Sequence, residues 1–410
     1  MKKIYSKISK CRISEDKKLI KVCDFGKIKL TGIFPRNKNQ ILVNTPLEIV
    51  FSKKSKLLQL NHNYNSTKLF GMNYGYRSGL NKSMVNHLKL KSKKLNKIIR
   101  FNKSDKILDI GSNDGTFLKL FSSKIFKFGC DPTAKKFRKY YDKSTKIIPK
   151  IFNEQTSKKI NVKFKLISCI AMFYDLSDPV KFCNLVESKL DKNGIFHIEI
   201  AYLPFIYKTF SFDTFCQEHL TYYSLTSFEN LIKKTNFKIL DYETNSINGG
   251  SINFNLALNN SKHKVNLKKI NKLKKFEDKN KFNNIKYVKN FFKNVKYNIN
   301  KIETKIKSLK GKVYGFGAST KGNVTLQLCN ITNKDFQGIY DINKEKFGKI
   351  TPGSNIKIED EKKIIKDQPD YLVFLIWHFK NTISEKLKKF KLKNTKYIWL
   401  FPKYKITKNK

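Results

Sequence analysis

The feature that most constrains this chain is the alternation of strand-like and helical segments between residues 105 and 258. Short apolar runs such as KILDI, FKFGCD and GIFHIEI are separated by stretches with helical spacing. This alternation is typical of a mostly parallel sheet with helices on both faces. The last two runs, FKILDYE and SINFNLAL, lack a helix between them and predict an antiparallel hairpin. We therefore expect an α/β fold with a Rossmann-like core.

Further units flank this core, which we expect to span residues 71–262. Residues 1–70 hold short strand-like pieces and predict a small β-rich domain, and apolar residues at helical spacing predict a helix over about 80–98. The amphipathic spacing in 263–310 predicts one long connecting helix or a helix pair. Strand-like runs alternate with helical material again over 311–410, which predicts a C-terminal Rossmann-like domain.

Charge is the most unusual feature of the composition. The 410 residues include 85 Lys+Arg against 32 Asp+Glu, a net charge of +53. A polycation gains affinity for nucleic acid by releasing counterions. However, only five basic residues are arginine, which is favoured for recognising bases and phosphates, and the lysines are spread over every segment. A/T-rich coding explains this pattern better than a nucleic-acid partner, and a polyanion-binding surface is the alternative.

The apolar patterning gives no sign of a membrane-spanning segment. The longest apolar run, Leu372 to Trp377, is six residues, far below the roughly 20 that a spanning helix needs. No apolar stretch of signal-peptide length follows the basic N-terminus, so we expect a cytoplasmic protein without membrane insertion. The seven cysteines are odd in number and scattered, which favours reduced core thiols over a disulfide framework.

The sharpest motif is KILDIGSNDGTFLKLF, residues 106–121. An apolar strand ends at Asp109, the chain turns through Gly111 and Gly115, and we expect a helix to begin at Thr116. Glycines let a ligand approach the backbone, and a helix N-terminus offers N–H groups. The spacing lacks the middle glycine of the dinucleotide fingerprint. Asp131 ends the next strand, where a carboxylate can accept hydrogen bonds from both ribose hydroxyls. Together these features predict a nucleoside cofactor site.

A second glycine-rich turn, GFGASTKGN, follows the first strand of the C-terminal domain. Its glycines combine with Ser319, Thr320 and Lys321 into a candidate phosphate cradle of backbone N–H groups and one ammonium. The lysine precedes Gly322, so the turn is not a Walker A sequence. A tight turn that only packs is the alternative interpretation.

DIGSNDGTF and GCDPTAKKF resemble the first two motifs of class I S-adenosylmethionine-dependent methyltransferases. Over about residues 10–405 the chain resembles the three-domain sugar C-methyltransferases in collinear order. The matching stretches are YGYRSGLNKSMVNHL, IAMFYDLSDP, CQEHLTYYSL, NGGS, GFGASTKGN and TPGSNI. The resemblance implies a zinc-binding type of N-terminal domain, a central methyltransferase domain and a C-terminal Rossmann-like domain. It also implies a nucleotide-activated keto-sugar as substrate, used for a surface polysaccharide or a glycosylated metabolite.

The resemblance also implies where the ligands bind. S-adenosylmethionine is expected to bind in the central domain at Asp109, Gly111, Asn113, Gly115, Asp131 and Phe173. The nucleotide-linked sugar is expected to contact the C-terminal domain at Ser319, Lys321, Asn323 and His378.

C-methylation needs a base and a group that stabilises an enolate oxygen. We predict His219 as the base, because histidine titrates near neutrality, with Glu218 orienting the loop or the substrate. Tyr76, Tyr222 and Tyr223 are candidates to donate a hydrogen bond to the enolate oxygen. Packing is the alternative role for each tyrosine.

The N-terminal domain departs from the family pattern of two C-x-x-C pairs. Cys11 is followed by Ser14, and Ser52 is followed by Ser55. Because a serine hydroxyl is a poor zinc ligand, we expect no zinc.

Two further departures lie in the CQEHLTYYSL and NGGS stretches. Gln217 replaces the first histidine of the family's H-E-H, and Asn248 stands where many relatives have histidine. Sequence alone does not place the accepting atom, which leaves open an O- or N-methyltransferase acting on another small molecule. Gln217 and the lost cysteines leave open an inactive polycationic binding protein on a methyltransferase scaffold. The retained motif residues argue against the inactive scaffold.

Overall fold

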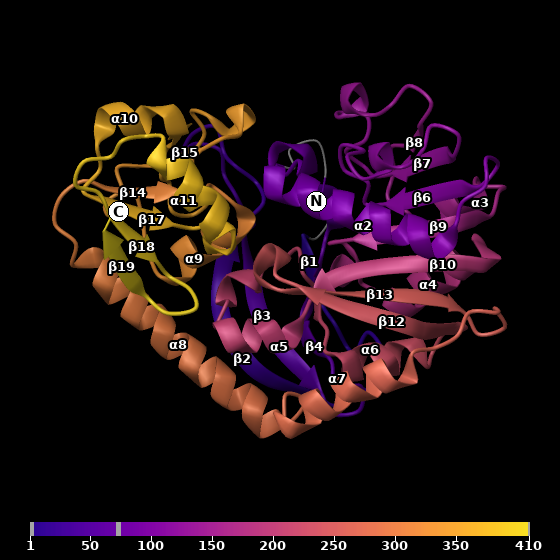
Figure 1. Cartoon of the computed structure of the whole chain (residues 1–410). Coiled ribbons are helices and arrows are strands. Elements are labelled where there is room, and N and C mark those ends of the chain that lie inside the picture. The colour runs from indigo at the N-terminus through magenta and orange to yellow at the C-terminus, as the bar shows by residue number, and fades with distance from the viewer. Residues whose placement is uncertain (1–3, 71–74, 409–410) are drawn as a thin grey trace.

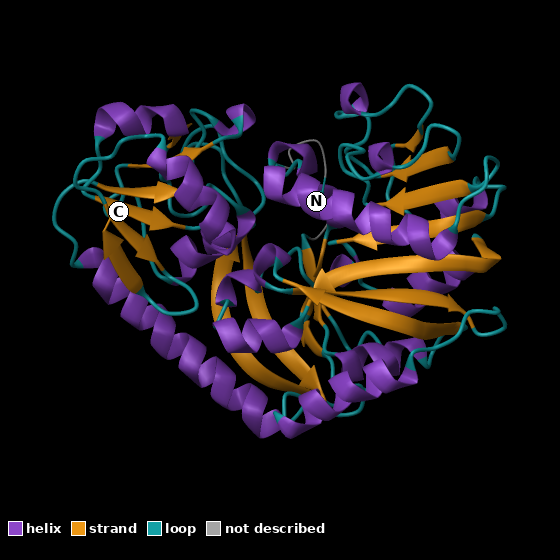
Figure 2. Cartoon of the chain, in the orientation of Figure 1, coloured by secondary structure: helices purple, strands orange, loops and turns teal. Residues whose placement is uncertain are grey.

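The computed structural model describes residues 4–70 and 75–408, whose strands form four sheets. The N-terminal strands lie between a larger central unit and a C-terminal unit, and long helices run along one side of all three (Figure 1). Figure 2 shows the same arrangement by secondary structure. The α/β fold with a Rossmann-like core is thereby confirmed.

The N-terminal unit is β-rich, as expected. Its strands are β1 (Tyr5–Lys7), β2 (Leu19–Lys29), β3 (Asn44–Ser52), β4 (Leu58–Leu60) and β5 (His62–Tyr64), followed by the short helix α1 (Ser66–Leu69). A strand from the central region, β11 (Thr221–Tyr222), pairs antiparallel with β4 and extends the sheet to the order β11-β4-β3-β2. This pairing fixes the segment around residues 216–222 against the N-terminal unit.

The central unit contains a seven-stranded sheet in the order β12-β13-β10-β9-β6-β7-β8. Its strands are β6 (Lys106–Ile110), β7 (Phe126–Cys130), β8 (Lys146–Ile148), β9 (Phe164–Ile170), β10 (Leu190–Ala201), β12 (Phe237–Asn245) and β13 (Ser251–Leu258). Only β13 runs antiparallel to its neighbours, which confirms the predicted hairpin. The strand order reverses between β6 and β9, and ligands bind at such switch points.

Helices and short 3-10 turns connect these strands. They are α2 (Lys82–Ile99), α3 (Glu154–Lys158), α4 (Pro179–Glu187), α5 (Leu203–Thr209), α6 (Leu225–Ile232), η1 (Ser78–Leu80), η2 (Leu118–Leu120), η3 (Arg138–Tyr140), η4 (Phe173–Asp175), η5 (Phe212–Thr214) and η6 (Ile247–Gly249). Our expectation of a helix from Thr116 was wrong, because only the single turn η2 forms there. Gly115 has a left-handed φ of +74°, and the chain passes through the single turn η2 before β7 begins at Phe126.

The predicted connecting segment is a pair of helices, α7 (Leu267–Lys279) and α8 (Ile285–Lys307). The apolar positions of α8 recur every three or four residues and are buried: Val288, Phe291, Phe292, Val295, Ile299, Ile302 and Ile306. This apolar face packs against the units beside it, including an edge-to-face contact between Phe292 and Phe25 of β2. Figure 1 shows α8 extending from below the central unit to the C-terminal unit.

The C-terminal unit has a six-stranded sheet in the order β16-β15-β14-β17-β18-β19. The strands are β14 (Val313–Phe316), β15 (Gly338–Asp341), β16 (Ile358–Asp360), β17 (Tyr371–Phe374), β18 (Lys396–Trp399) and β19 (Lys405–Lys408), and only β19 is antiparallel. The connections contain α9 (Thr320–Leu328), α10 (Ile364–Asp367), α11 (Lys380–Lys388), η7 (Lys344–Lys346), η8 (Glu361–Lys363) and η9 (Trp377–Phe379). The order reverses between β14 and β17, which makes a second switch point.

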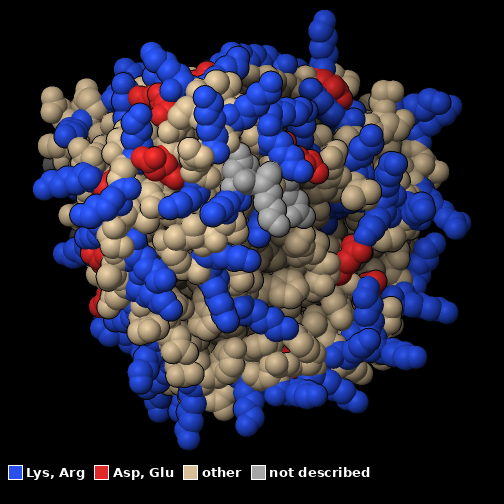
Figure 3. All heavy atoms as spheres, turned by 60° about the vertical axis from the view of Figure 1, so that its left-hand side comes forward, with Lys and Arg blue, Asp and Glu red and all other residues tan. Residues whose placement is uncertain are grey.

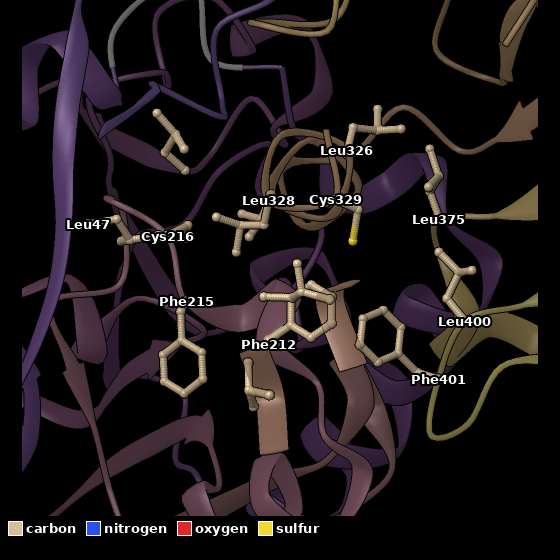
Figure 4. Close-up of a cluster of buried hydrophobic side chains, with 14 of the residues drawn as sticks. Leu47, Phe212, Phe215, Cys216, Leu326, Leu328, Cys329, Leu375, Leu400 and Phe401 are labelled. Atoms are coloured by element: carbon tan, nitrogen blue, oxygen red, sulfur yellow. The ribbon is translucent and has the colours of Figure 1, made fainter. Parts of the chain in front are cut away.

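One apolar core joins the three units. Figure 4 shows Leu47 of the N-terminal sheet, Phe212 and Phe215 of the central region, and Leu328 and Phe401 of the C-terminal unit in a single cluster. Such shared packing holds the two switch points in a fixed relation.

The surface carries the charge seen in the sequence. Figure 3 shows Lys and Arg side chains over the whole visible face, with few acidic groups between them. Among residues 4–70 and 75–408, no helix is long and apolar enough to cross a membrane.

Candidate functional site

The two switch points open onto one cavity of about 330 Å³. The loops after β6 and β9 of the central sheet line it from one side. Ser319–Lys321, Ile376, His378 and Phe379 line it from the C-terminal unit. The segment holding Glu218 and His219 completes the wall. Ligands at both switch points would therefore meet in the same space.

The central-domain end of the cavity is built by the turn after β6. The backbone N–H of Asn113 donates to Asp131 Oδ2 at 2.9 Å, and Thr133 N–H donates to Asp131 Oδ1 at 2.7 Å. Burial raises the pKa of Asp131. Gly111 adopts a φ of +78°, and a Cβ there would lie 3.0 Å from Met172. The turn thus needs glycine, and it places Asp131 on the cavity wall.

Asp109 and Asn113 hold this end of the cavity together. The Ser168 hydroxyl donates to Asp109 Oδ1 at 2.6 Å, and burial raises the pKa of Asp109 to about 7. Asn113 Oδ1 accepts from Ser78 N–H at 2.9 Å, and its Nδ2 donates to the Tyr76 carbonyl at 3.2 Å. Asn113 therefore fastens the Tyr76–Ser78 segment over the cavity.

Two predicted cofactor-binding residues, Phe173 and Gly115, do not line the cavity. Phe173 is fully buried and packs against Phe182 and Tyr223 in the core. A Cβ at Gly115 would lie 2.5 Å from the ring of Tyr141. Phe173 and Gly115 therefore contribute to the packing beneath the cavity.

His219 lies on the cavity wall with a defined tautomer. Its Nδ1 is 2.9 Å from the Thr214 carbonyl, which can only accept, so Nδ1 carries the proton and Nε2 has the free lone pair. Its ring packs edge-on against Tyr174 with centroids 4.4 Å apart. Burial, followed by the charge of Lys321, lowers the pKa of His219 to about 3. The imidazole is therefore neutral at pH 7, and our expectation that His219 titrates near neutrality was wrong, because burial disfavours its charged form.

The residues beside His219 point in different directions. Glu218 lines the cavity, and burial raises its pKa to about 8. A Cβ at Gly32 would lie 2.0 Å from Glu218 Oε1, so the N-terminal unit must have glycine there. Gln217 is fully buried and donates from Nε2 to Thr45 Oγ1 at 3.1 Å. Gln217, which replaces a histidine of the family pattern, thus contacts the N-terminal sheet.

The three candidate tyrosines divide into two groups. Tyr76 lines the cavity and is 42% exposed. Tyr222 is buried against Phe215, and Tyr223 packs against Phe228. Pairing of β11 with β4 directs this segment into the core, so Tyr222 and Tyr223 fit packing roles.

The C-terminal side of the cavity combines a helix N-terminus with one buried ammonium. Ser319 caps α9 by accepting from Gly322 N–H at 2.9 Å. Lys321 Nζ donates to the Asn248 carbonyl at 2.6 Å, and burial lowers the pKa of Lys321. Both lysine and serine line the cavity. An anion placed here would meet the positive end of the helix and the ammonium.

His378 and Asn323, also predicted on this side, take different positions. His378 lines the cavity, and burial lowers its pKa well below the usual range. Its neighbour Trp377 donates from Nε1 to Asp213 Oδ2 at 2.9 Å, which ties the loop to the central unit. Asn323 is fully buried and donates to the Thr31 carbonyl at 2.7 Å. Asn323 thus joins the C-terminal and N-terminal units.

Two carboxyl groups on the cavity wall were missed by the sequence reasoning. Asp175, at the end of η4, lies next to the switch point of the central sheet. Glu199 lies near the end of β10 and contacts His87 Nε2 at 2.8 Å and Lys91 Nζ at 2.5 Å. Burial alone would raise the pKa of Glu199, but Lys91 and His87 outweigh it and lower that pKa to about 2. Asp175 follows β9 and Glu199 lies near the C-terminal end of β10, and these positions at the ends of parallel strands were the available signal.

The zinc-type positions of the N-terminal unit converge without a suitable ligand set. Cys11 Sγ lies 3.1 Å from Ser55 Oγ, and Ser14 Oγ lies 3.3 Å from Ser52 Oγ. Burial raises the pKa of the Cys11 thiol, but hydrogen bonds from Ser14 and Ser55 outweigh it and lower that pKa. One thiol and three hydroxyls that hydrogen-bond to each other do not fit zinc.

A second group of metal-type residues lies at the cavity. Donor atoms of Cys216, Glu218 and His219 lie within 4.8 Å of one another. Burial raises the pKa of the Cys216 thiol well above its usual range, which disfavours the thiolate form that binds metal.

Comparisons with known proteins agree with this geometry. The sequence matches the family described as "Methyltransferase domain" over residues 85–242 and the family described as "C-methyltransferase C-terminal domain" over residues 246–402. The chain is 26% identical over 398 residues to the C-methyltransferase NovU of Streptomyces niveus, covering 95% of this chain and 94% of that protein.

Solved structures show similarity over less than half of this chain. An S-adenosylmethionine-dependent methyltransferase from Clostridium acetobutylicum is 16% identical with a TM-score of 0.34, covering 42% of this chain and 92% of that chain. The plantazolicin methyltransferase BpumL in complex with SAH is 13% identical with a TM-score of 0.33, covering 42% of this chain and 82% of that chain.

Proposed function

This chain belongs to the S-adenosylmethionine-dependent methyltransferases that combine a methyltransferase domain with a C-methyltransferase C-terminal domain, and from that premise we propose that it methylates a carbon beside the ketone of a nucleotide-activated keto-sugar. The observation that carries this proposal is the single cavity that both switch points share. One side fits a nucleoside cofactor and the other fits an anion. The product would enter a surface polysaccharide or a glycosylated metabolite.

The residues of the central unit fit the cofactor. We propose that Asp131 accepts hydrogen bonds from the ribose hydroxyls and that the Gly111 turn admits the cofactor to the backbone. Asp109 and Asn113 support this turn through Ser168 and the Tyr76–Ser78 segment. When bound, S-adenosylmethionine supplies an electrophilic methyl carbon, whose bond to sulfur breaks as the bond to the substrate carbon forms.

His219 is the proposed base. Because Nδ1–H donates to the Thr214 carbonyl, the neutral ring keeps the Nε2 lone pair for the proton on the carbon next to the ketone. Removal of that proton leaves the electron pair in an enolate, whose carbon attacks the methyl group. Tyr174 fixes the plane of the imidazole by its edge-on contact. No step needs a metal ion.

The C-terminal unit is proposed to hold the diphosphate of the substrate. The N-terminus of α9 and the Lys321 ammonium face the cavity together, and His378 lies on the loop after β17. A diphosphate placed there would set the sugar toward His219. The surface lysines would also attract such an anionic substrate.

The test follows the substrate proton and the methyl group separately. The chain is incubated in heavy water with nucleotide-linked keto-sugars and methyl-labelled S-adenosylmethionine, and products are read by nuclear magnetic resonance. We expect deuterium at the carbon beside the ketone and a new carbon–carbon bond to the labelled methyl. A methyl ether or methyl amine without carbon exchange would contradict the proposal and assign an O- or N-methyltransferase. Cofactor binding without turnover of any keto-sugar would also contradict it.

A further inference from the structure

The turn between β12 and β13 brings a side chain of the central unit to the proposed anion-binding side of the cavity. This turn is η6, and Asn248 at its centre lines the cavity. The Asn248 carbonyl accepts a hydrogen bond from Lys321 Nζ at 2.6 Å. Because Lys321 is the ammonium proposed to bind the diphosphate, Asn248 lies where the sugar attached to that diphosphate would begin.

Both units hold the backbone of this turn in place. The Gly250 carbonyl accepts from the Tyr202 backbone N–H at 3.1 Å, and a Cβ at Gly250 would lie 2.5 Å from the Phe205 side chain of α5. A Cβ at Gly249 would lie 3.0 Å from the Trp377 ring of the C-terminal unit. The close packing on both sides therefore fixes the position of the Asn248 backbone.

Asn248 combines a strained backbone with an unpaired side chain. Its φ of +54° lies in the left-handed region, which residues other than glycine rarely adopt and which is common at ligand sites. Within the part of the chain that the structure describes, no group hydrogen-bonds to its amide. Asn113, at the central-domain end of the cavity, has a similar φ of +49°, but its amide is used twice, by the Ser78 N–H and by the Tyr76 carbonyl. The Asn248 amide is therefore available to a ligand.

Accepting the proposed C-methyltransferase function, we propose that Asn248 is a specificity-determining residue whose amide hydrogen-bonds to a hydroxyl of the sugar ring. The contact lies between the diphosphate at Lys321 and the carbon that His219 deprotonates. An amide donates from Nδ2 and accepts at Oδ1, which matches a hydroxyl, since a hydroxyl also does both. A sugar with hydrogen in place of that hydroxyl leaves the amide unpaired inside the cavity and binds more weakly.

One substitution removes the amide and keeps the turn. Asn248→Gly deletes the side chain, and glycine adopts a positive φ without strain, so the Lys321 contact with the backbone carbonyl is retained. Asn355→Gly is the matched control, because Asn355 also has a left-handed φ of +55° but is exposed and does not line the cavity. The melting temperatures of the two variants should change by similar amounts, since both replace a left-handed asparagine by glycine.

The decisive measurement compares ligands with and without the hydroxyl. Calorimetry is carried out with uridine and thymidine diphosphate, with their glucose conjugates, and with conjugates of glucose that lack one ring hydroxyl each. We expect the wild type to bind the glucose conjugate about threefold to tenfold more tightly than the conjugate without the contacted hydroxyl, the ratio that one neutral hydrogen bond provides. Asn248→Gly should bind both conjugates equally and keep its affinity for the nucleoside diphosphate and for S-adenosylmethionine. Asn355→Gly should keep the wild-type preference.

Three binding results would overturn the role of Asn248. One is a wild type that binds every conjugate with the same affinity. Another is an Asn248→Gly variant that keeps the wild-type preference for the hydroxyl, because the amide then does not contact the sugar. The third is a variant that loses as much affinity for the nucleoside diphosphate as for its glucose conjugate, because Asn248 then acts only by holding Lys321.

Turnover separates this proposal from the proposed function. With a keto-sugar that the wild type methylates, Asn248→Gly should raise KM about threefold to tenfold and keep kcat within a few-fold. An unchanged KM leaves the proposed function standing and contradicts the role of Asn248. Conjugates bound with the expected preference but without any methyl transfer keep the sugar contact and contradict the proposed function. If the wild type neither binds a conjugate nor methylates a keto-sugar, both proposals fail.

Discussion

The two Rossmann-like units build the same turn and use it differently. In each, a glycine after the first strand donates to a carbonyl of the second strand, and an aspartate at the end of the second strand accepts a backbone N–H from the turn. The central bonds are Gly111 N–H to Cys130 O at 2.8 Å and Asn113 N–H to Asp131 Oδ2 at 2.9 Å. The C-terminal bonds are Gly317 N–H to Tyr340 O at 2.8 Å and Ala318 N–H to Asp341 Oδ2 at 2.8 Å.

What surrounds the two aspartates differs. Asp131 lines the cavity, whereas Lys346 Nζ lies 3.8 Å from Asp341 Oδ2 and donates to the Ala318 carbonyl at 2.6 Å. A cation of the chain itself thus covers the second aspartate. The C-terminal unit instead faces the cavity with α9 and Lys321. The turn common to both units therefore stabilises the fold. Only next to Asp131 does it leave open space in which a ligand could bind.

The largest expected effect concerns the chemistry on the central side. His219→Gln removes the base and should lower kcat by about 10²–10⁴, with S-adenosylmethionine affinity unchanged. Exchange of the carbon-bound proton in heavy water should disappear with it. His263→Gln is the matched control, because His263 contacts the Asn193 carbonyl at 2.9 Å outside the cavity. Exchange that persists in His219→Gln would exclude His219 as the base and favour Tyr76.

The second effect tests the two aspartates directly. Asp131→Ala removes the proposed ribose acceptor and should weaken S-adenosylmethionine binding by about 1–3 kcal/mol, measured by calorimetry. Asp341→Ala should leave that affinity unchanged, since Lys346 covers Asp341. Equal losses of S-adenosylmethionine affinity in both variants would mean that the two aspartates stabilise the fold and that Asp131 does not contact the cofactor.

Much of this arrangement was predictable from the sequence, because local patterns encode it. Strand and helix alternation gave the sheets and their hairpin, and glycine spacing located both turns. In place of the helix expected from Thr116, the chain forms only the single turn η2 before β7, which the local pattern did not indicate. No pattern in the sequence indicates that Lys346 covers Asp341, since that contact depends on tertiary packing.

The site was less predictable than the fold. Whether Tyr222 and Phe173 face the cavity or the core depends on which side of a short segment each occupies, and β11 pairs with a strand far away in sequence. Nothing in the sequence distinguishes Asp175 from an ordinary loop residue. In the structure, the Leu220 N–H donates to the carbonyl of the neighbouring Tyr174 and so joins the Asp175 segment to the segment that holds His219. Long-range pairing therefore decides which polar residues reach the ligand.

A third effect tests the anion-binding side. Lys321→Met should raise KM for a nucleotide-linked sugar roughly tenfold, about 1.5 kcal/mol for a hydrogen bond to a charged group, with S-adenosylmethionine affinity unchanged. Lys346→Met is the matched control, because its ammonium covers Asp341. A KM change in Lys346→Met but not in Lys321→Met would place the diphosphate at the other turn.

The smallest effect extends the comparison to the N-terminal unit, where one thiol and three hydroxyls occupy the positions at which the resemblance implies zinc ligands. Cys11, Ser14, Ser52 and Ser55 converge through hydrogen bonds. Ser52→Ala should lower the free energy of unfolding by about 1 kcal/mol, the usual contribution of one hydrogen bond. A chelator should leave the melting temperature of the wild type unchanged. The combined Ser14→Cys, Ser52→Cys and Ser55→Cys variant would supply four thiols and should bind one zinc. About one zinc in the wild type, purified without added metal, would show that the hydroxyl cluster does not replace the metal.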